Sequence, residues 1–76
     1  MMSYEEYRKK VYELFLKRCL THLSEQDKLR YLDENEKFIQ ESYQDDLYRF
    51  NEMGMDKVFT DTGILAGVCD NLEKLW

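Results

Sequence analysis

Hydrophobic residues recur at helical spacing from the start of the chain, and two separate stripes share its first segment. The first stripe recurs every three or four positions, as one face of a helix does. It comprises Tyr4, Tyr7, Val11, Leu14 and Phe15. A second stripe, displaced by more than about 100° around the helix at 100° per residue, comprises Leu16, Leu20 and Leu23. A helix that is apolar around so much of its girth is usually central or contacts two partners.

Helix start signals divide the first two thirds of the chain. A Ser or Asp followed three positions later by an acidic residue is a capping pattern. It occurs as Ser3 with Glu6, Ser24 with Asp27, and Asp33 with Glu36. These signals predict helices over about 4–23, 25–32 and 34–53. One continuous helix over 25–53 remains an alternative, because one apolar stripe runs through Leu29, Leu32, Ile39, Tyr43, Leu47 and Phe50.

The last third predicts a connection and a final helix. Gly54 follows the last periodic residue and fits a left-handed C-terminal cap. Residues 55–61 form the expected connection, and a helix over about 62–75 would share one face among Ile64, Leu65, Val68, Leu72, Leu75 and Trp76. The alternative is a hairpin that pairs residues 58–60 with 64–66. Gly63 and Gly67 allow either close packing of another helix or a local backbone requirement.

Composition supports an all-α fold. The chain has no Pro and three Gly, and neither type occurs in the first 53 residues. A β-rich fold needs more frequent turn residues. We therefore expect a single domain over residues 1–76, built as a small compact bundle of three to four helices.

The net charge of −5 is concentrated in the middle of the chain. Residues 1–23 carry five bases and three acids, 24–53 carry four bases and nine acids, and 54–76 carry two bases and four acids. An acidic chain disfavours direct nucleic-acid binding, which needs a basic face. The longest apolar run is too short for a membrane span. The chain shows no signal-peptide pattern. We interpret its two cysteines as buried thiols, although one disulfide bridge could join them, and we therefore expect the protein in the cytoplasm.

The most distinctive polar feature is a row of four carboxylates on the predicted helix 34–53. Glu34, Glu41, Asp45 and Glu52 follow each other at spacings of 7, 4 and 7 residues. The row would be roughly 27 Å long at 1.5 Å per residue. It could imitate nucleic-acid phosphates and block a DNA- or RNA-binding protein, by analogy with phage or mobile-element inhibitors of the anti-restriction or anti-CRISPR type. The alternative is a solvated helix face, and nearby Arg49 and Phe38 weaken the mimicry.

Three patterns with chemical potential are each incomplete. Asp61-Thr62-Gly63 is the triplet of aspartic proteases, which need a second Asp beside the first. Cys19 and His22 could face one metal from a helix, with Cys69 as a third ligand, but a structural zinc site takes four. No Gly-rich phosphate loop is present. We predict a non-enzymatic protein with no metal and no cofactor.

The expected function is a protein–protein interaction module that associates with itself, most simply as a homodimer. Leu16, Leu20 and Leu23 are the predicted contact residues on the first helix, together with Trp76 near the other end of the chain. The argument is energetic, because burial of one Leu side chain contributes about 1.5–3 kcal/mol. Another protein is the alternative partner.

Overall fold

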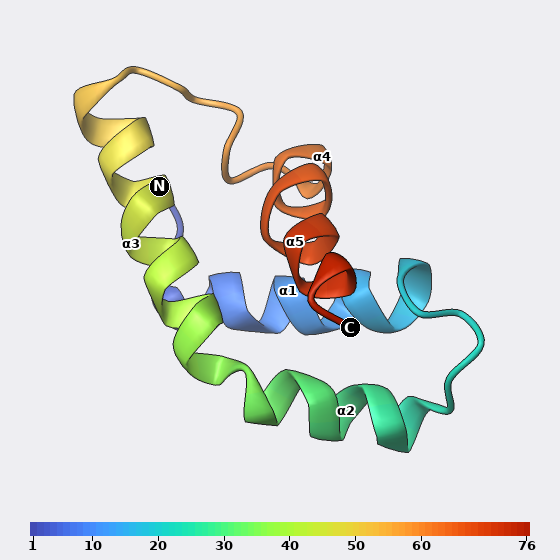
Figure 1. The fold of residues 1–76 in the computed structure, drawn as a ribbon. Helices are drawn as coiled ribbons and strands as arrows, with labels where there is room; N and C mark the ends of the chain where they lie inside the picture. The colour runs from blue at the N-terminus through green and yellow to red at the C-terminus, as the bar shows by residue number, and fades with distance from the viewer.

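The first helix is the element around which the rest of the chain packs. The computed structural model describes residues 1–76, and helices account for 74% of them. The elements are α1 (Tyr4–Arg18), α2 (Glu25–Glu34), α3 (Glu36–Glu52), α4 (Asp61–Ile64), the π-helical turn η1 (Leu65–Cys69) and α5 (Asp70–Lys74). α1 contacts α2, α3, α4 and η1. In Figure 1, α1 and α2 lie side by side, α3 leads away from α2, and the terminal segment packs across α1. The all-α bundle is confirmed, and the hairpin alternative is wrong.

The predicted starts of the first two helices are confirmed by their caps. The Ser3 hydroxyl accepts the Glu6 N–H at 3.2 Å and donates to the Glu6 carboxylate at 3.0 Å. The Ser24 hydroxyl accepts the Asp27 N–H at 3.2 Å. Each bond satisfies a backbone donor that the first turn of a helix leaves free. These starts are local features, so sequence alone identifies them.

The first helix ends at Arg18, five residues earlier than expected. Cys19 is extended, and Leu20 adopts a left-handed conformation with φ of 46°. That conformation is uncommon for residues other than Gly, so the sequence carries no warning of it. The Leu20 N–H donates to the Glu73 carboxylate of α5 at 2.8 Å. A residue 53 positions away therefore holds the end of α1 in place.

α2 and α3 are separate helices that meet at Asn35. The Asn35 side-chain amide donates to the Tyr31 carbonyl at 2.8 Å and shares that oxygen with the Asn35 backbone N–H, which lies 3.1 Å from it. Asn side chains often compete with the backbone in this way. The expected cap at Asp33 was wrong, because Asp33 lies inside α2 and accepts the Tyr12 hydroxyl instead.

The terminal segment is a helix with one widened turn. η1 makes a π-helical turn, in which residues five apart align. This alignment places Cys69 on the same side as Ile64, and both are buried, as are Val68 and Leu72. Leu75 was expected on that face but is 58% exposed. The expectation assumed an uninterrupted α-helical period.

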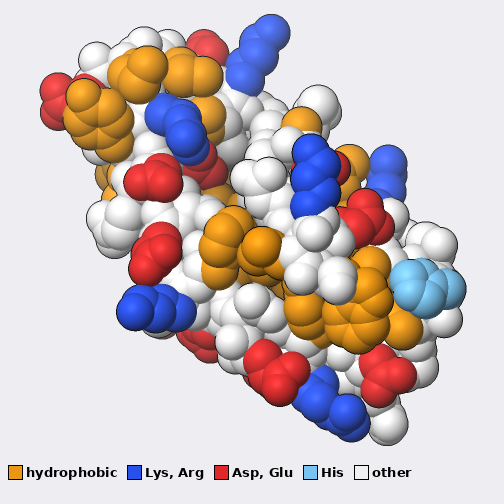
Figure 2. Space-filling view, in the orientation of Figure 1, with side chains coloured by type: hydrophobic (Ala, Val, Ile, Leu, Met, Phe, Trp, Pro, Cys, Tyr) orange, Lys and Arg blue, Asp and Glu red, His pale blue; other side chains and the backbone are white.

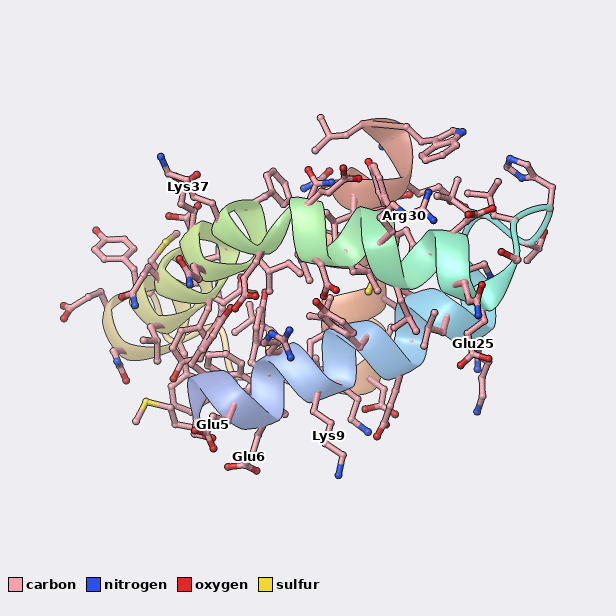
Figure 3. All side chains as sticks on the ribbon, turned by 90° about the horizontal axis from the view of Figure 1, so that it is seen from below. Glu5, Glu6, Lys9, Glu25, Arg30 and Lys37 are labelled. Carbon is pink, nitrogen blue, oxygen red and sulfur yellow. The ribbon has the colours of Figure 1, made fainter.

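The core joins α1 to every later part of the chain. Its largest fully buried side chains include Tyr7, Phe15, Leu32, Ile39, Ile64 and Leu72. Lys28 is also buried, and its ammonium donates to the Leu16 carbonyl at 2.9 Å. A cation is favourable at that point, because Leu16 lies in the last turn of α1, where the helix dipole is negative. The outer side of α1 is charged, and Figure 3 shows Glu5, Glu6 and Lys9 pointing away from the body of the protein.

No helix has both the length and the apolar composition that a membrane crossing requires.

Candidate functional site

Three of the four predicted row residues lie together on the outer side of α3. Glu41, Asp45 and Glu52 are exposed. None of the three forms an ion pair, because every ion pair of the chain uses another carboxylate. Glu34 is exposed but is the last residue of α2, beyond the break at Asn35. The prediction of four carboxylates on one helix was therefore wrong in this respect.

Tyr48 lies within the shortened row and was overlooked in the sequence. It follows Asp45 by three positions and precedes Glu52 by four, so helical spacing places it between them. Its side chain is exposed, at 61%. The sequence did indicate that Tyr48 would be exposed, because this residue falls outside the apolar stripe of the helix. We call Glu41, Asp45, Tyr48 and Glu52 the acidic face.

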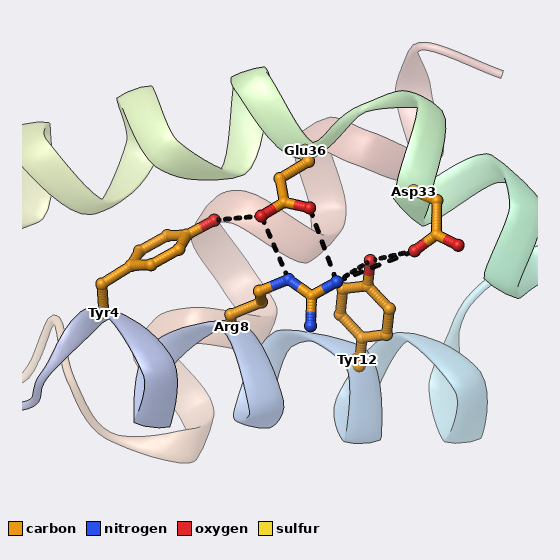
Figure 4. Close-up of polar contacts among 5 residues, drawn as sticks. All are labelled: Tyr4, Arg8, Tyr12, Asp33 and Glu36. Carbon is orange, nitrogen blue, oxygen red and sulfur yellow. Dashed lines mark hydrogen bonds and ion pairs between the residues drawn. The ribbon is translucent and has the colours of Figure 1, made fainter.

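Two neighbouring carboxylates are used to hold α1 against the junction of α2 and α3 (Figure 4). Glu36 accepts the Tyr4 hydroxyl and the Arg8 Nε–H, both at 3.2 Å. Asp33 accepts the Tyr12 hydroxyl at 2.6 Å, and burial together with this bond raises the pKa of Tyr12. The Arg8 guanidinium also lies over the Tyr12 ring, 4.4 Å from its centroid. These carboxylates therefore have structural partners that the acidic face lacks.

Asp46 is a third structural carboxylate, and it engages Arg49, a base close to the acidic face. Its Oδ2 accepts the Tyr7 hydroxyl at 2.8 Å, and burial together with Asp46 raises the pKa of Tyr7. Its Oδ1 accepts the Arg49 guanidinium, also at 2.8 Å. Arg49 was expected to weaken the acidic row, but its ion pair is with Asp46 and not with Glu41 or Asp45.

A groove separates α3 from the terminal helical segment. It consists of two cavities of about 230 and about 430 Å³ that share Asp46, Arg49 and Gly67. The smaller cavity is also lined by Phe38, Glu41, Ser42, Asp45, Val68 and Asn71. The larger one continues along Met55, Asp56, Lys57, Val58 and Gly63. Figure 2 shows apolar side chains in the space between the acidic side chains over α3 and the terminal segment. We call the two cavities together the α3–η1 groove.

The predicted leucine contacts do not form one surface. Because α1 ends at Arg18, Leu20 and Leu23 lie beyond the helix that carries Leu16. Leu20 is buried in the single chain, at 5% exposed, and Leu16 and Leu23 are half-buried against the same core. The stripe on which this contact was based was therefore wrong. Trp76 is different, because it is 60% exposed and packs edge-on against Tyr31, with ring centroids 5.1 Å apart.

The residues considered for chemistry are not gathered into a site. Cys19 and Cys69 are free and buried, whereas His22 is exposed and lies outside any helix. Burial, and the neighbouring Cys19, raise the pKa of Cys69 to about 12. No group of three or more His, Cys, Asp or Glu side chains is placed to hold a metal ion. Asp61 opens α4 directly after the Thr60 cap and forms an ion pair with Lys10 at 3.4 Å.

No protein-family model, curated protein or solved structure matches this chain. The functional argument therefore starts from the acidic face and the groove beside it.

Proposed function

We propose that this chain is a non-enzymatic protein-interaction module that binds a basic surface of another protein through its acidic face. The supporting observation is the exposed set of Glu41, Asp45 and Glu52, which have no ion-pair partner and flank the exposed Tyr48. Other carboxylates nearby have partners that stabilise the fold. The acidic face has none, so its charge is available to a ligand.

Two physical effects favour such a partner. Unpaired carboxylates of one sign attract a basic surface and accelerate its approach. Tyr is enriched among residues that dominate binding energy at interfaces. Its ring also attracts Lys or Arg through a cation–π interaction worth about 0.5–1 kcal/mol at an exposed site. Tyr48 can therefore add short-range contact to the long-range charge attraction.

The position of Glu52 is consistent with a role other than stability. It is the last residue of α3, where the helix dipole disfavours negative charge. Its carboxylate makes no ion pair that would offset this effect. A basic partner bound beside Glu52 would make its negative charge favourable, because the attraction would outweigh the effect of the helix dipole.

A narrower version of the proposal concerns the kind of partner. A protein that binds DNA or RNA presents Lys and Arg to phosphates, and carboxylates along α3 would compete for that surface. The protein would then act as an inhibitor of the anti-restriction or anti-CRISPR type. We place it in the cytoplasm, because free thiols such as Cys19 and Cys69 are typical of a reducing compartment.

Self-association is the second candidate, on a different observation. Leu75 and Trp76 are 58% and 60% exposed, and Trp76 packs against the half-buried Tyr31. Adjacent exposed apolar side chains of this size favour an interface. Under this proposal Trp76 is the contact residue, whereas Leu20 belongs to the core. Sedimentation velocity distinguishes the cases: a dimer that becomes a monomer with Trp76→Ala supports the second candidate, and a monomeric wild type at high micromolar concentration rejects it.

The test of the leading proposal is capture of basic proteins from host lysate with two matched variants. Glu41→Gln with Asp45→Asn removes two charges from the acidic face. Glu5→Gln with Glu13→Gln removes two charges from α1, where both residues are exposed. Quantitative mass spectrometry should show one basic protein lost with the first pair and retained with the second. Equal retention by both pairs would reject the proposal.

A further inference from the structure

The smaller cavity of the α3–η1 groove has one charged wall and one uncharged wall, whereas Asp56 and Lys57 line the larger cavity. The α3 side carries Glu41, Asp45, Asp46 and Arg49, and of these Asp46 and Arg49 are paired with each other. The terminal segment contributes only uncharged residues to this cavity: Gly67, Val68 and Asn71. Two unpaired carboxylates therefore face a mostly neutral wall. A narrow space of this kind concentrates the field of its charges, and the field favours a cation.

Gly67 keeps the groove open, and no close contact in the fold explains why it is Gly. A Cβ at Gly67 would meet no atom within 4 Å. Gly in a helix interior is less favourable than Ala by about 0.5–1 kcal/mol. The comparison within the same helix is Gly63, where a Cβ would overlap the backbone of Lys57 and Val58. Packing requires Gly at position 63 but leaves position 67 free for a side chain from elsewhere.

The π-helical turn adds to this geometry. Gly67 is the middle residue of η1, and single π turns within helices occur frequently at functional sites. The turn directs Val68 and Cys69 into the core and leaves Gly67 on the groove side. Phe38 from α3 is half-buried on the opposite wall. This part of the groove thus combines two apolar side chains, Phe38 and Val68, with a carboxylate rim.

We propose that the α3–η1 groove receives an arginine side chain from a segment of the partner protein. The aliphatic stem would lie along Phe38, Gly67 and Val68, because such stems pack on apolar surface while the charge reaches a polar region. The guanidinium would contact Glu41 and Asp45, which are one helical turn apart and can accept from its several donors. This inference rests on the proposed function, since it names the group that the acidic region recognises.

The test uses a fluorescein-labelled peptide of arginine and alanine, with a citrulline peptide as the uncharged control probe. Binding is followed by fluorescence anisotropy. Gly67→Leu fills the groove, whereas Ala66→Leu adds the same side chain one residue away, at an exposed position that does not line it. We expect Gly67→Leu to weaken binding of the arginine peptide by about tenfold or more, equivalent to roughly 1.4 kcal/mol. Ala66→Leu should bind as the wild type does.

Three results would overturn the inference, and they separate it from the proposed function. If Gly67→Leu binds as tightly as the wild type while Glu41→Gln with Asp45→Asn loses binding, the acidic face binds arginine without the groove. If Ala66→Leu weakens binding as much as Gly67→Leu, the effect does not come from filling the groove. If the wild type binds arginine and citrulline peptides equally, both the groove and the acidic face are rejected. Circular dichroism of each variant confirms that the helices are retained.

Discussion

Gly63 and Gly67 provide a matched pair in which one substitution should have opposite effects. They lie four residues apart in the same terminal helix and are both half-buried. The loop before this helix folds back on Gly63, because the Thr60 hydroxyl donates to the Lys57 carbonyl at 2.7 Å. A Cβ at Gly63 would clash with that carbonyl oxygen and lie 2.9 Å from the Val58 oxygen. Both obstacles are backbone atoms, so the loop itself must shift.

The expected magnitudes follow from helix propensity and overpacking. Gly67→Ala meets no neighbour within 4 Å, so it should stabilise the protein by about 0.5–1 kcal/mol. Gly63→Ala gains the same propensity term but overpacks the loop, which typically costs about 1–3 kcal/mol or more. Its net effect should be destabilising. In a domain of this size each kcal/mol shifts the melting temperature by roughly 4–8 °C.

Thermal unfolding followed by far-ultraviolet circular dichroism measures both variants against the wild type. The melting temperature should rise for Gly67→Ala and fall for Gly63→Ala. A Gly63→Ala protein as stable as the wild type would show that the loop does not pack against α4 as described. A destabilised Gly67→Ala protein would show that the π-helical turn needs Gly for its own backbone, and would remove one support for the groove.

Three further predictions concern charge and protonation. Glu52→Lys should raise the urea midpoint and add about 0.3–1 kcal/mol, since it replaces an anion by a cation at the negative end of α3; a lower midpoint would contradict this. The pKa of Cys69 is raised from 9.0 to about 12. The stabilisation that the protonated Cys69 thiol contributes is therefore complete below pH 9 and is lost as the pH rises toward 12. Urea titrations should show that decline, and Cys69→Ala should reduce it. Glu73→Ala leaves the Leu20 N–H without its acceptor, which should destabilise the protein by about 1–3 kcal/mol and accelerate hydrogen exchange at that amide.

The sequence predicted those parts of the fold that neighbouring residues determine. Ser3 and Ser24 cap helices through bonds that span three residues. Gly54 takes the expected positive φ, 66°. The end of α1 and the π-helical turn were not predictable in the same way. Leu20 is held by a distant carboxylate, and η1 departs from the period of 3.6 residues that was assumed for the predicted helix 62–75.

The candidate site also has one part that the sequence predicts and another part that depends on the tertiary fold. Exposure of Glu41, Asp45 and Glu52 followed from their spacing on one helix. The break at Asn35 removed Glu34 from the row, because Asn35, with φ of −110° and ψ of 22°, leaves the helical conformation between α2 and α3. The groove was not predictable, since its second wall comes from residues 55–58 and 63–71, which reach α3 only through the tertiary fold.

The bond from Leu20 to Glu73 has a consequence for the order of events during synthesis. α1 is synthesised before Glu73, so the growing chain at first lacks the acceptor that holds the end of the first helix. Residues 19–23 contain no Gly or Pro, and Leu20 would be free to leave its unfavourable left-handed conformation and extend the helix. The native corner between α1 and α2 therefore forms only after Glu73 has been made. A nascent chain arrested before α5 should carry a longer first helix than the folded structure does.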